Sequence, residues 1–189
     1  MTTTISAVIL AGGQGKRMGG VDKGLQLWRN QPLFKQVYQK LLPQIDNISI
    51  SANRHQDIYA QSGLSVFADP FKDFQGPLAG IYSALGQAKT DLVLFVPCDC
   101  PFLPNNLLEK LLESLLSHKA KIAYAYDGER AHPTFCLIST SLKDELADYL
   151  ATGQRKMLCF MQQNQAIAVD FCEQKECFRN FNTIDDLRE

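Results

Sequence analysis

Short apolar runs alternate along this chain with longer segments whose apolar residues recur at helical spacing. The apolar runs lie at residues 5–10, 47–53, 64–69, 91–99, 121–128, 132–139 and 166–171. The segments with helical spacing or helix-start signals lie at residues 32–45, 76–88, 104–118 and 141–153. Strands that alternate with helices predict an α/β fold: a doubly wound, mostly parallel sheet with helices on both faces. The Asp127-Gly128 pair predicts a hairpin, and therefore at least one late antiparallel strand.

The length and charge of the chain narrow its class. It has 189 residues, which favours a single domain over residues 1–189 with a sizeable core. Its net charge of −1 supplies no general field that would attract nucleic acid or an anionic membrane. No apolar run approaches the ~20 residues that cross a bilayer, and the first residues lack a signal-peptide pattern. We therefore expect a cytoplasmic protein with no nucleic-acid or membrane partner.

The six cysteines indicate reduced thiols rather than a disulfide framework or a zinc site. None of them forms a C-x-x-C pair, and the chain has only three histidines. Cys98 and Cys100 flank Asp99 and could suggest a soft metal, but we expect two thiols one residue apart in a strand-end turn to point apart. We interpret Cys98 as a core residue and Cys100 as incidental.

The segment 12–20 has the composition of an anion-binding loop. It holds five glycines in nine residues and follows the apolar run that ends at Leu10. Ligands of a parallel sheet bind beyond the carboxyl ends of its strands, which is where this loop lies. Glycines let backbone N–H groups approach an anion closely, here at Gly12, Gly13 and Gly15. Positive charge comes from Lys16, Arg17 and Lys23.

The loop matches neither of two common phosphate-binding motifs. A Walker loop requires Ser or Thr after Gly-Lys, but here Gly15 and Lys16 are followed by Arg17. The dinucleotide fingerprint fails because Gly13-x-Gly15 leads to Met18. A solvent loop with merely solvated cations is the alternative, and the density of glycines directly after a buried strand argues against it.

Two aspartates directly follow apolar runs. Asp99 ends the run 91–99, and Asp69 ends the run 64–69. A carboxylate at the same sheet edge as the glycine loop suits Mg²⁺, which takes one or two carboxylates and leaves other positions for phosphate and water. Asp99 is therefore a candidate metal ligand. For both aspartates, a role in forming a turn is the competing interpretation.

Several segments together resemble a known enzyme family. The stretch LAGGQGKRMGGVDKG resembles the signature of nucleotidyltransferases that activate a phosphorylated acceptor with a nucleoside triphosphate. It is similar, more narrowly, to the bacterial molybdenum cofactor guanylyltransferases. The same similarity extends in order through ANRHQDIYAQSGLSVFAD, GPLAGIYSAL, LFVPCDCPFLP, DGERAHPTF and NFNTIDDL. The resemblance covers nearly the whole chain.

This resemblance implies a Rossmann-like fold, a reaction and a set of site residues. GMP would be transferred from GTP to the terminal phosphate of molybdenum-bound molybdopterin, with loss of pyrophosphate. Arg17, Lys23 and Asp99 would be catalytic, and Asp99 would bind Mg²⁺, or Mn²⁺ in its place. The nucleotide-binding residues would be Leu10, Ala11, Gly12, Gly13, Lys23, Ser51, Asn53, Asp69 and Asp99.

The chain departs from the family at Ser51, where asparagine is usual, so a hydroxyl or the backbone would make that base contact. Related cytidylyltransferases often have alanine at the position of Gly12, and a glycine leaves more room for a purine, which favours GTP. A cytidylyltransferase for molybdopterin or for a sugar or polyol phosphate is the nearest alternative. A nucleotide-binding module without turnover is another. His55 is interpreted as a hydrogen-bonding loop residue rather than a base.

A second polar cluster lies where the family would bind the pterin phosphate. It comprises Glu129, Arg130, His132, Arg155 and Lys156. Arg155 and Lys156 suit the anionic groups of the acceptor, and a solvated basic pair at a helix junction is the alternative. A molybdoenzyme or a cofactor-delivery chaperone stays open as a protein partner.

Overall fold

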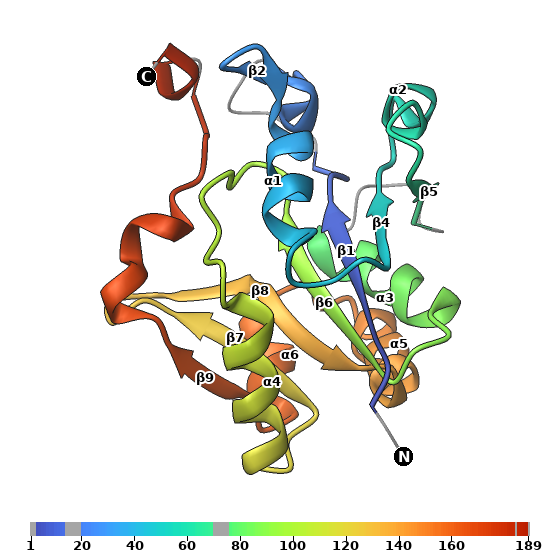
Figure 1. Cartoon of the computed structure of the whole chain (residues 1–189). Coiled ribbons are helices and arrows are strands. Elements are labelled where there is room, and N and C mark those ends of the chain that lie inside the picture. Colours follow the sequence, from blue (N-terminus) through green and yellow to red (C-terminus); the bar gives the residue numbers. More distant parts are fainter. Residues whose placement is uncertain (1–2, 14–19, 70–75, 184, 189) are drawn as a thin grey trace.

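The computed structural model describes residues 3–13, 20–69, 76–183 and 185–188. In this part of the chain, seven strands form one sheet with helices on both of its faces (Figure 1). The strand order is β5-β4-β1-β6-β8-β7-β9. The strands are β1 (Ile5–Leu10), β4 (Ile48–Ser51), β5 (Ser65–Phe67), β6 (Leu92–Pro97), β7 (Ile122–Tyr126), β8 (Ala131–Ser139) and β9 (Ile167–Asp170).

The sheet is mostly parallel, as the alternating pattern predicts. β1 pairs in parallel with β4 and β6, and β4 pairs in parallel with β5. β8 pairs antiparallel with both β6 and β7, while β7 and β9 are parallel. Among the described strands of this sheet, β8 therefore runs against all the others. The predicted α/β class and the predicted hairpin at Gly128, which has φ +91°, are both confirmed.

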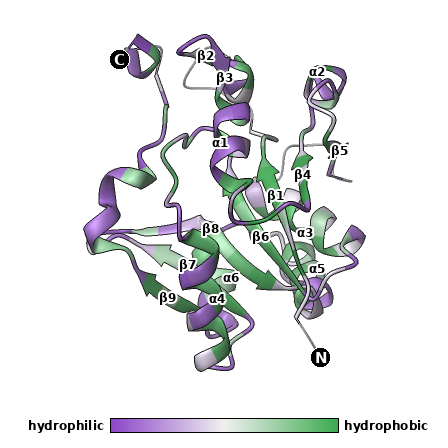
Figure 2. Cartoon of the chain, viewed as in Figure 1, coloured by the Kyte–Doolittle hydropathy of each residue, from purple (hydrophilic) through white to green (hydrophobic). Residues whose placement is uncertain are grey.

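The two helical layers are built on two apolar clusters. Helices α1 (Leu33–Leu41) and α4 (Leu107–Ser117) cover one face, and α3 (Pro77–Gln87), α5 (Lys143–Ala151) and α6 (Met157–Gln163) cover the other (Figure 1). Successive residues of β1 alternate between the layers: Ala7 and Ile9 pack with α1 and α4, and Val8 packs with α3 and α5. Figure 2 shows hydrophobic residues concentrated on the central strands between these layers.

Several short elements were not predicted. They are the helices α2 (Gln56–Ala60) and α6, the paired strands β2 (Leu27–Trp28) and β3 (Gln31–Pro32), and the 3-10 helices η2 (Lys23–Leu25), η3 (Thr140–Leu142) and η4 (Cys172–Phe178). Elements of two to seven residues are too short for their apolar residues to repeat at a recognisable helical or strand spacing, so the sequence pattern does not predict them. The 3-10 helix η5 (Asp185–Arg188), in contrast, follows the capping signal that Thr183, Asp185 and Asp186 give in the sequence. Within the described ranges, no helix combines the length and apolar character needed to cross a membrane.

Candidate active site

A cavity of about 500 Å³ opens where β1, β4 and β6 end. The three strands are parallel, so the residues that follow them meet at one edge of the sheet. The cavity wall contains every predicted nucleotide-binding residue: Leu10, Ala11, Gly12, Gly13, Lys23, Ser51, Asn53, Asp69 and Asp99. Arg17, the remaining predicted catalytic residue, lies outside the described residues, as do Gly15 and Lys16.

Close packing explains why glycine occupies two positions of the cavity wall. A Cβ at Gly12 would lie 3.2 Å from the Nδ2 of Asn53, and a Cβ at Gly80 would lie 2.8 Å from the hydroxyl oxygen of Ser51. Gly80 belongs to α3, so the absence of a side chain there lets the helix approach the end of β4. A Cβ at Gly13 would meet no heavy atom within 4 Å, since this glycine borders open space.

Lys23 and Asp99 form an ion pair in the wall of the cavity. The Nζ of Lys23, in η2, lies 3.1 Å from the Oδ2 of Asp99, which follows β6. The two side chains are 22% and 10% exposed, so solvent screens their attraction less than it would at an open surface. The same Nζ donates to the Oδ1 of Asn182 at 2.7 Å. The C-terminal segment is thereby joined to the glycine-loop side of the cavity.

The second carboxylate oxygen of Asp99 also has partners. Its Oδ1 accepts a hydrogen bond from the Nδ2 of Asn180 at 3.4 Å and from the thiol of Cys100 at 3.6 Å. The backbone N–H of Phe181 donates to the backbone carbonyl of Asp99 at 2.9 Å. Asp99 is therefore held by its neighbour Cys100 and by two segments that are far from it in the sequence, one at Lys23 and one at Asn180 and Phe181.

Both cysteines beside Asp99 are buried. Cys98 packs in the core, as predicted, and also borders the cavity. The interpretation of Cys100 as incidental is wrong, because it is fully buried and donates to Asp99. Burial raises the pKa of both thiols well above the usual value, and the nearby charge of Asp99 raises it further. Both sulfurs stay protonated at neutral pH and are poor metal ligands in that form.

Asn53 and Asp69 form a reciprocal pair across the ends of β4 and β5. The Nδ2 of Asn53 donates to the Oδ2 of Asp69. The backbone N–H of Asp69 donates in return to the Oδ1 of Asn53 at 3.0 Å. The pair fixes the orientation of the Asn53 amide and holds both side chains at the cavity wall.

Asp22 is a buried residue of the cavity wall that the sequence motifs did not predict. It is 6% exposed and accepts hydrogen bonds from the hydroxyl of Tyr59 at 2.6 Å and from the Nδ1 of His55 at 3.1 Å. The interpretation of His55 as a hydrogen-bonding loop residue agrees with this contact. Burial raises the pKa of Tyr59 above its ordinary value, and Cys98 and Asp22 add to the rise. The signal that could have identified Asp22 was its place next to Lys23.

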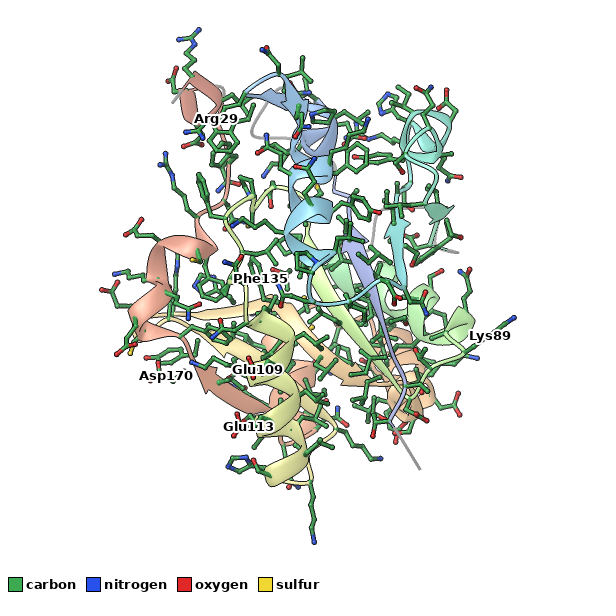
Figure 3. The ribbon with its side chains drawn as sticks, in the orientation of Figure 1. Arg29, Lys89, Glu109, Glu113, Phe135 and Asp170 are labelled. Carbon is green, nitrogen blue, oxygen red and sulfur yellow. The ribbon has the colours of Figure 1, made fainter. Side chains whose placement is uncertain are left out.

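A bulge in β8 brings a second unpredicted residue, Thr134, to the cavity. Tyr124 pairs with Cys136, but the next residue of β7, Ala125, pairs with His132. Three residues of β8 are therefore inserted between these two pairs, and Thr134 is the middle one. Pro133, which cannot donate to a sheet ladder, was the available sequence signal for this irregularity. Phe135 returns to the interior, where Figure 3 shows it in the middle of the molecule.

The predicted second polar cluster does not reach the cavity. Its five members, all of them described, are absent from the cavity wall: Glu129, Arg130, His132, Arg155 and Lys156. The guanidinium of Arg155 instead donates to the carbonyls of Leu150 at 2.8 Å and Gln154 at 2.6 Å. Arg155 therefore satisfies carbonyls at the end of α5 in this structure.

His132 belongs to a buried, hydrogen-bonded pair at the β7–β8 hairpin. Its Nε2 lies 2.6 Å from the Oδ2 of Asp127, and its ring stacks on Phe178 at 4.6 Å between centroids. Burial raises the pKa of Asp127, but the hydrogen bonds that it accepts lower the pKa more, to well below its ordinary value. The donors are the backbone N–H groups of Arg130 and Glu129 and the ring of His132. The ionised carboxylate fixes one end of the segment that leads to Thr134.

Comparison with known proteins gives a consistent family. Residues 7–167 match the family model described as "MobA-like NTP transferase domain". The molybdenum cofactor guanylyltransferase of Pasteurella multocida is 62% identical over 188 residues, which cover 100% of both chains. The enzyme of the same description from Haemophilus influenzae is 53% identical over 189 residues, covering 100% of this chain and 98% of its own.

Solved structures show the same fold at much lower identity. The molybdopterin-guanine dinucleotide biosynthesis protein A of Archaeoglobus fulgidus superposes with a TM-score of 0.79 at 22% identity, covering 97% of this chain and 95% of its own. A nucleotidyl transferase from Methanothermobacter gives a TM-score of 0.75 at 20% identity, covering 98% and 94%. At these identities the likeness establishes the fold alone.

Proposed function

Since the chain belongs to the family of MobA-like NTP transferases, we propose that it transfers GMP from GTP to molybdopterin. The terminal phosphate of molybdenum-bound molybdopterin attacks the α-phosphorus of GTP, pyrophosphate leaves, and the guanine dinucleotide form of the cofactor results. The observation that carries this proposal is the convergence of Gly12, Gly13, Lys23 and Asp99 on one cavity at the end of β1.

The cavity offers positive charge and backbone donors to a triphosphate. Phosphoryl-type transfer depends mainly on positioning and on electrostatic stabilisation, so no general base is required. Gly12 and Gly13 give the backbone close access to the phosphates, and Lys23 supplies a cation beside them. The α3 helix begins at Pro77 in the same wall, and the positive end of its dipole favours an anion there. Arg17 would add a second cation.

Asp99 is the residue we propose as ligand of a divalent ion, Mg²⁺ or Mn²⁺. Within the described ranges, no group of three or more His, Cys, Asp or Glu residues forms a metal cage. Mg²⁺ is commonly held by one or two carboxylates together with substrate phosphates, so one carboxylate at the cavity wall fits such an ion. When bound, the ion would neutralise charge on the phosphates as pyrophosphate leaves. Lys23 and Asn180 hold the carboxylate of Asp99 in place for it.

The base and ribose would lie at the ends of β4 and β5. Ser51, Asn53 and Asp69 place hydroxyl, amide and carboxylate groups there. GTP is favoured as the donor because the close relatives are described as guanylyltransferases. We further propose that residues 1–189 form one nucleotidyltransferase domain, because the C-terminal segment contributes Asn180 and Asn182 to the contacts around Asp99 and Lys23.

The proposal is tested by turnover with purified components. The protein is incubated with molybdenum-bound molybdopterin, Mg²⁺ and each nucleoside triphosphate in turn, and pyrophosphate and dinucleotide are measured. We expect product with GTP and little with CTP. Product with CTP and none with GTP would show that the protein is a cytidylyltransferase and would overturn the proposed use of GTP. GTP binding without pyrophosphate release under any condition would identify a binding module and overturn the proposed activity.

A further inference from the structure

The guanidinium of Arg54 joins the two described ends of the glycine loop. Its Nη1 donates to the carbonyl of Gly20 at 2.7 Å, and its Nη2 donates to the carbonyl of Gly13 at 3.1 Å. These carbonyls lie on either side of residues 14–19, and Gly13 borders the cavity. Arg54 itself is absent from the cavity wall. One side chain outside the cavity therefore sets the distance between two points of the loop backbone.

Arg54 is the middle one of three consecutive side chains that hold different parts of the cavity wall. Asn53 is paired with Asp69, Arg54 with the loop carbonyls, and His55 with the buried carboxylate of Asp22. This connector between β4 and α2 turns sharply, since His55 has a φ of +49°, in the left-handed region. The connector is thus the part of the chain that links the glycine loop to the base side of the cavity.

A loop that binds phosphate through its N–H groups must keep its carbonyl oxygens away from the phosphate. Carbonyl oxygens carry the negative end of the peptide dipole and would repel the ligand. Arg54 binds two such oxygens from outside the cavity, and its charge offsets theirs. The planar guanidinium presents separate N–H groups to two acceptors at once, which the point charge of a lysine does not reproduce.

We propose that Arg54 is a positioning residue that holds the backbone at Gly13 and Gly20 in the arrangement that receives the triphosphate of the donor nucleotide. The inference rests on the proposed function, because it assumes that the cavity receives a nucleoside triphosphate. It assigns to Arg54 no contact with the substrate. Its effect should therefore fall on the part of the ligand that the loop contacts, the phosphates, and spare the nucleoside.

The experiment compares GTP and guanosine binding by Arg54→Lys, Arg54→Gln and wild-type protein in the presence of Mg²⁺. GTP affinity is measured by calorimetry and guanosine affinity by NMR titration. Arg29→Lys is the matched control, because Arg29 is an exposed arginine over Trp28 that Figure 3 shows at the periphery. For both Arg54 variants we expect the Kd for GTP to rise at least about tenfold, since two charge-assisted hydrogen bonds to the loop are lost or distorted. The Kd for guanosine should stay within about twofold, as should both values for the control.

Two results would overturn the inference. Wild-type GTP affinity in Arg54→Lys would mean that charge alone suffices and that the bridging geometry is irrelevant. An equal loss for GTP and guanosine would mean that Arg54 supports the fold in general rather than the phosphate side. Wild-type protein that binds no GTP is distinguishable from both results and would overturn this inference together with the proposed function. Wild-type protein that binds GTP but releases no pyrophosphate would overturn the proposed activity alone.

Discussion

Two hollows lie at opposite ends of strands β1, β4 and β6, and they differ in the charge of the residues that line them. The larger one, at the carboxyl ends, measures about 500 Å³ and includes Asp22, Lys23, Asp69 and Asp99. The smaller one, at the amino ends, measures about 250 Å³, and Lys89 is the one charged residue in its described wall. The same strands therefore have several charged side chains at one edge and a nearly neutral lining at the other.

The two edges differ in the kind of side chain that the flanking loops bring together. At the amino edge, short polar side chains satisfy each other: the hydroxyls of Ser6 and Thr90 lie 2.8 Å apart. At the carboxyl edge, charged side chains from separate loops meet, as Lys23 and Asp99 do. Helix α3 strengthens the difference, because its N-terminus borders the larger hollow and its C-terminal residues border the smaller one.

The largest difference in activity between matched variants at the two edges should come from the aspartates that flank β6, Asp91 and Asp99. We expect Asp99→Asn to lower the rate of pyrophosphate release by about 10³-fold or more, because the proposed metal ligand is lost. The matched substitution Asp91→Asn lies just before β6, where Asp91 accepts hydrogen bonds from Thr4. It should leave the rate within about twofold. Steady-state kinetics with GTP check both, and comparable losses in the two variants would break the comparison.

Two lysines provide the next largest effect. Lys23→Gln should lower kcat/KM for GTP by about 10²-fold, since it removes a cation beside the proposed phosphate position and leaves Asp99 unpaired. Lys89→Gln is the control, because Lys89 is exposed and points outward at the amino edge (Figure 3). We expect no change above twofold there. A kcat/KM for Lys23→Gln near the wild-type value would contradict the proposed catalytic role of Lys23.

The smallest effect concerns two glycines of α3. Gly80→Ala should lower the free energy of unfolding by about 1–3 kcal/mol, because the new Cβ would lie against the hydroxyl of Ser51. Gly86→Ala should raise the free energy of unfolding by roughly 0.5–1 kcal/mol, because alanine loses less conformational entropy than glycine when a helix forms. The new Cβ would meet the Cε of Lys143 at 3.5 Å, an ordinary contact distance, so no steric cost offsets this gain. Urea unfolding measures both.

A double variant separates crowding at Ser51 from a general effect on the helix. Adding Ser51→Ala to Gly80→Ala should recover most of the lost stability, since the crowded oxygen is removed. Strictly additive losses in the double variant would contradict the steric explanation.

Much of the carboxyl edge was predictable because its residues follow strong apolar runs. Leu10, Asn53 and Asp99 lie at the ends of runs whose apolar character predicts buried strands, and parallel strands bring their ends together. The family resemblance then assigned roles to these positions. Helix ends were less accurate: the segment predicted as 104–118 is helical over Leu107–Ser117.

The missed residues depend on contacts that no local pattern contains. Asn182 reaches the site through a hydrogen bond to Lys23, 159 residues earlier in the chain. Thr134 reaches the cavity through a bulge, which shifts the pairing of β7 and β8 in a way that strand periodicity does not indicate. Arg155 shows the opposite case, because a basic residue that suits an anionic acceptor binds the end of α5 in this structure. Residue type alone did not decide between these outcomes.

The most direct test of the account is calorimetric titration of the folded wild-type protein with GTP, with Mg²⁺ present and after its removal by a chelator. We expect one nucleotide site per chain whose affinity falls at least about tenfold without Mg²⁺, and whose Mg²⁺ dependence disappears in Asp99→Asn. Absence of binding by any nucleoside triphosphate, or equal GTP affinity with and without the ion, would contradict it.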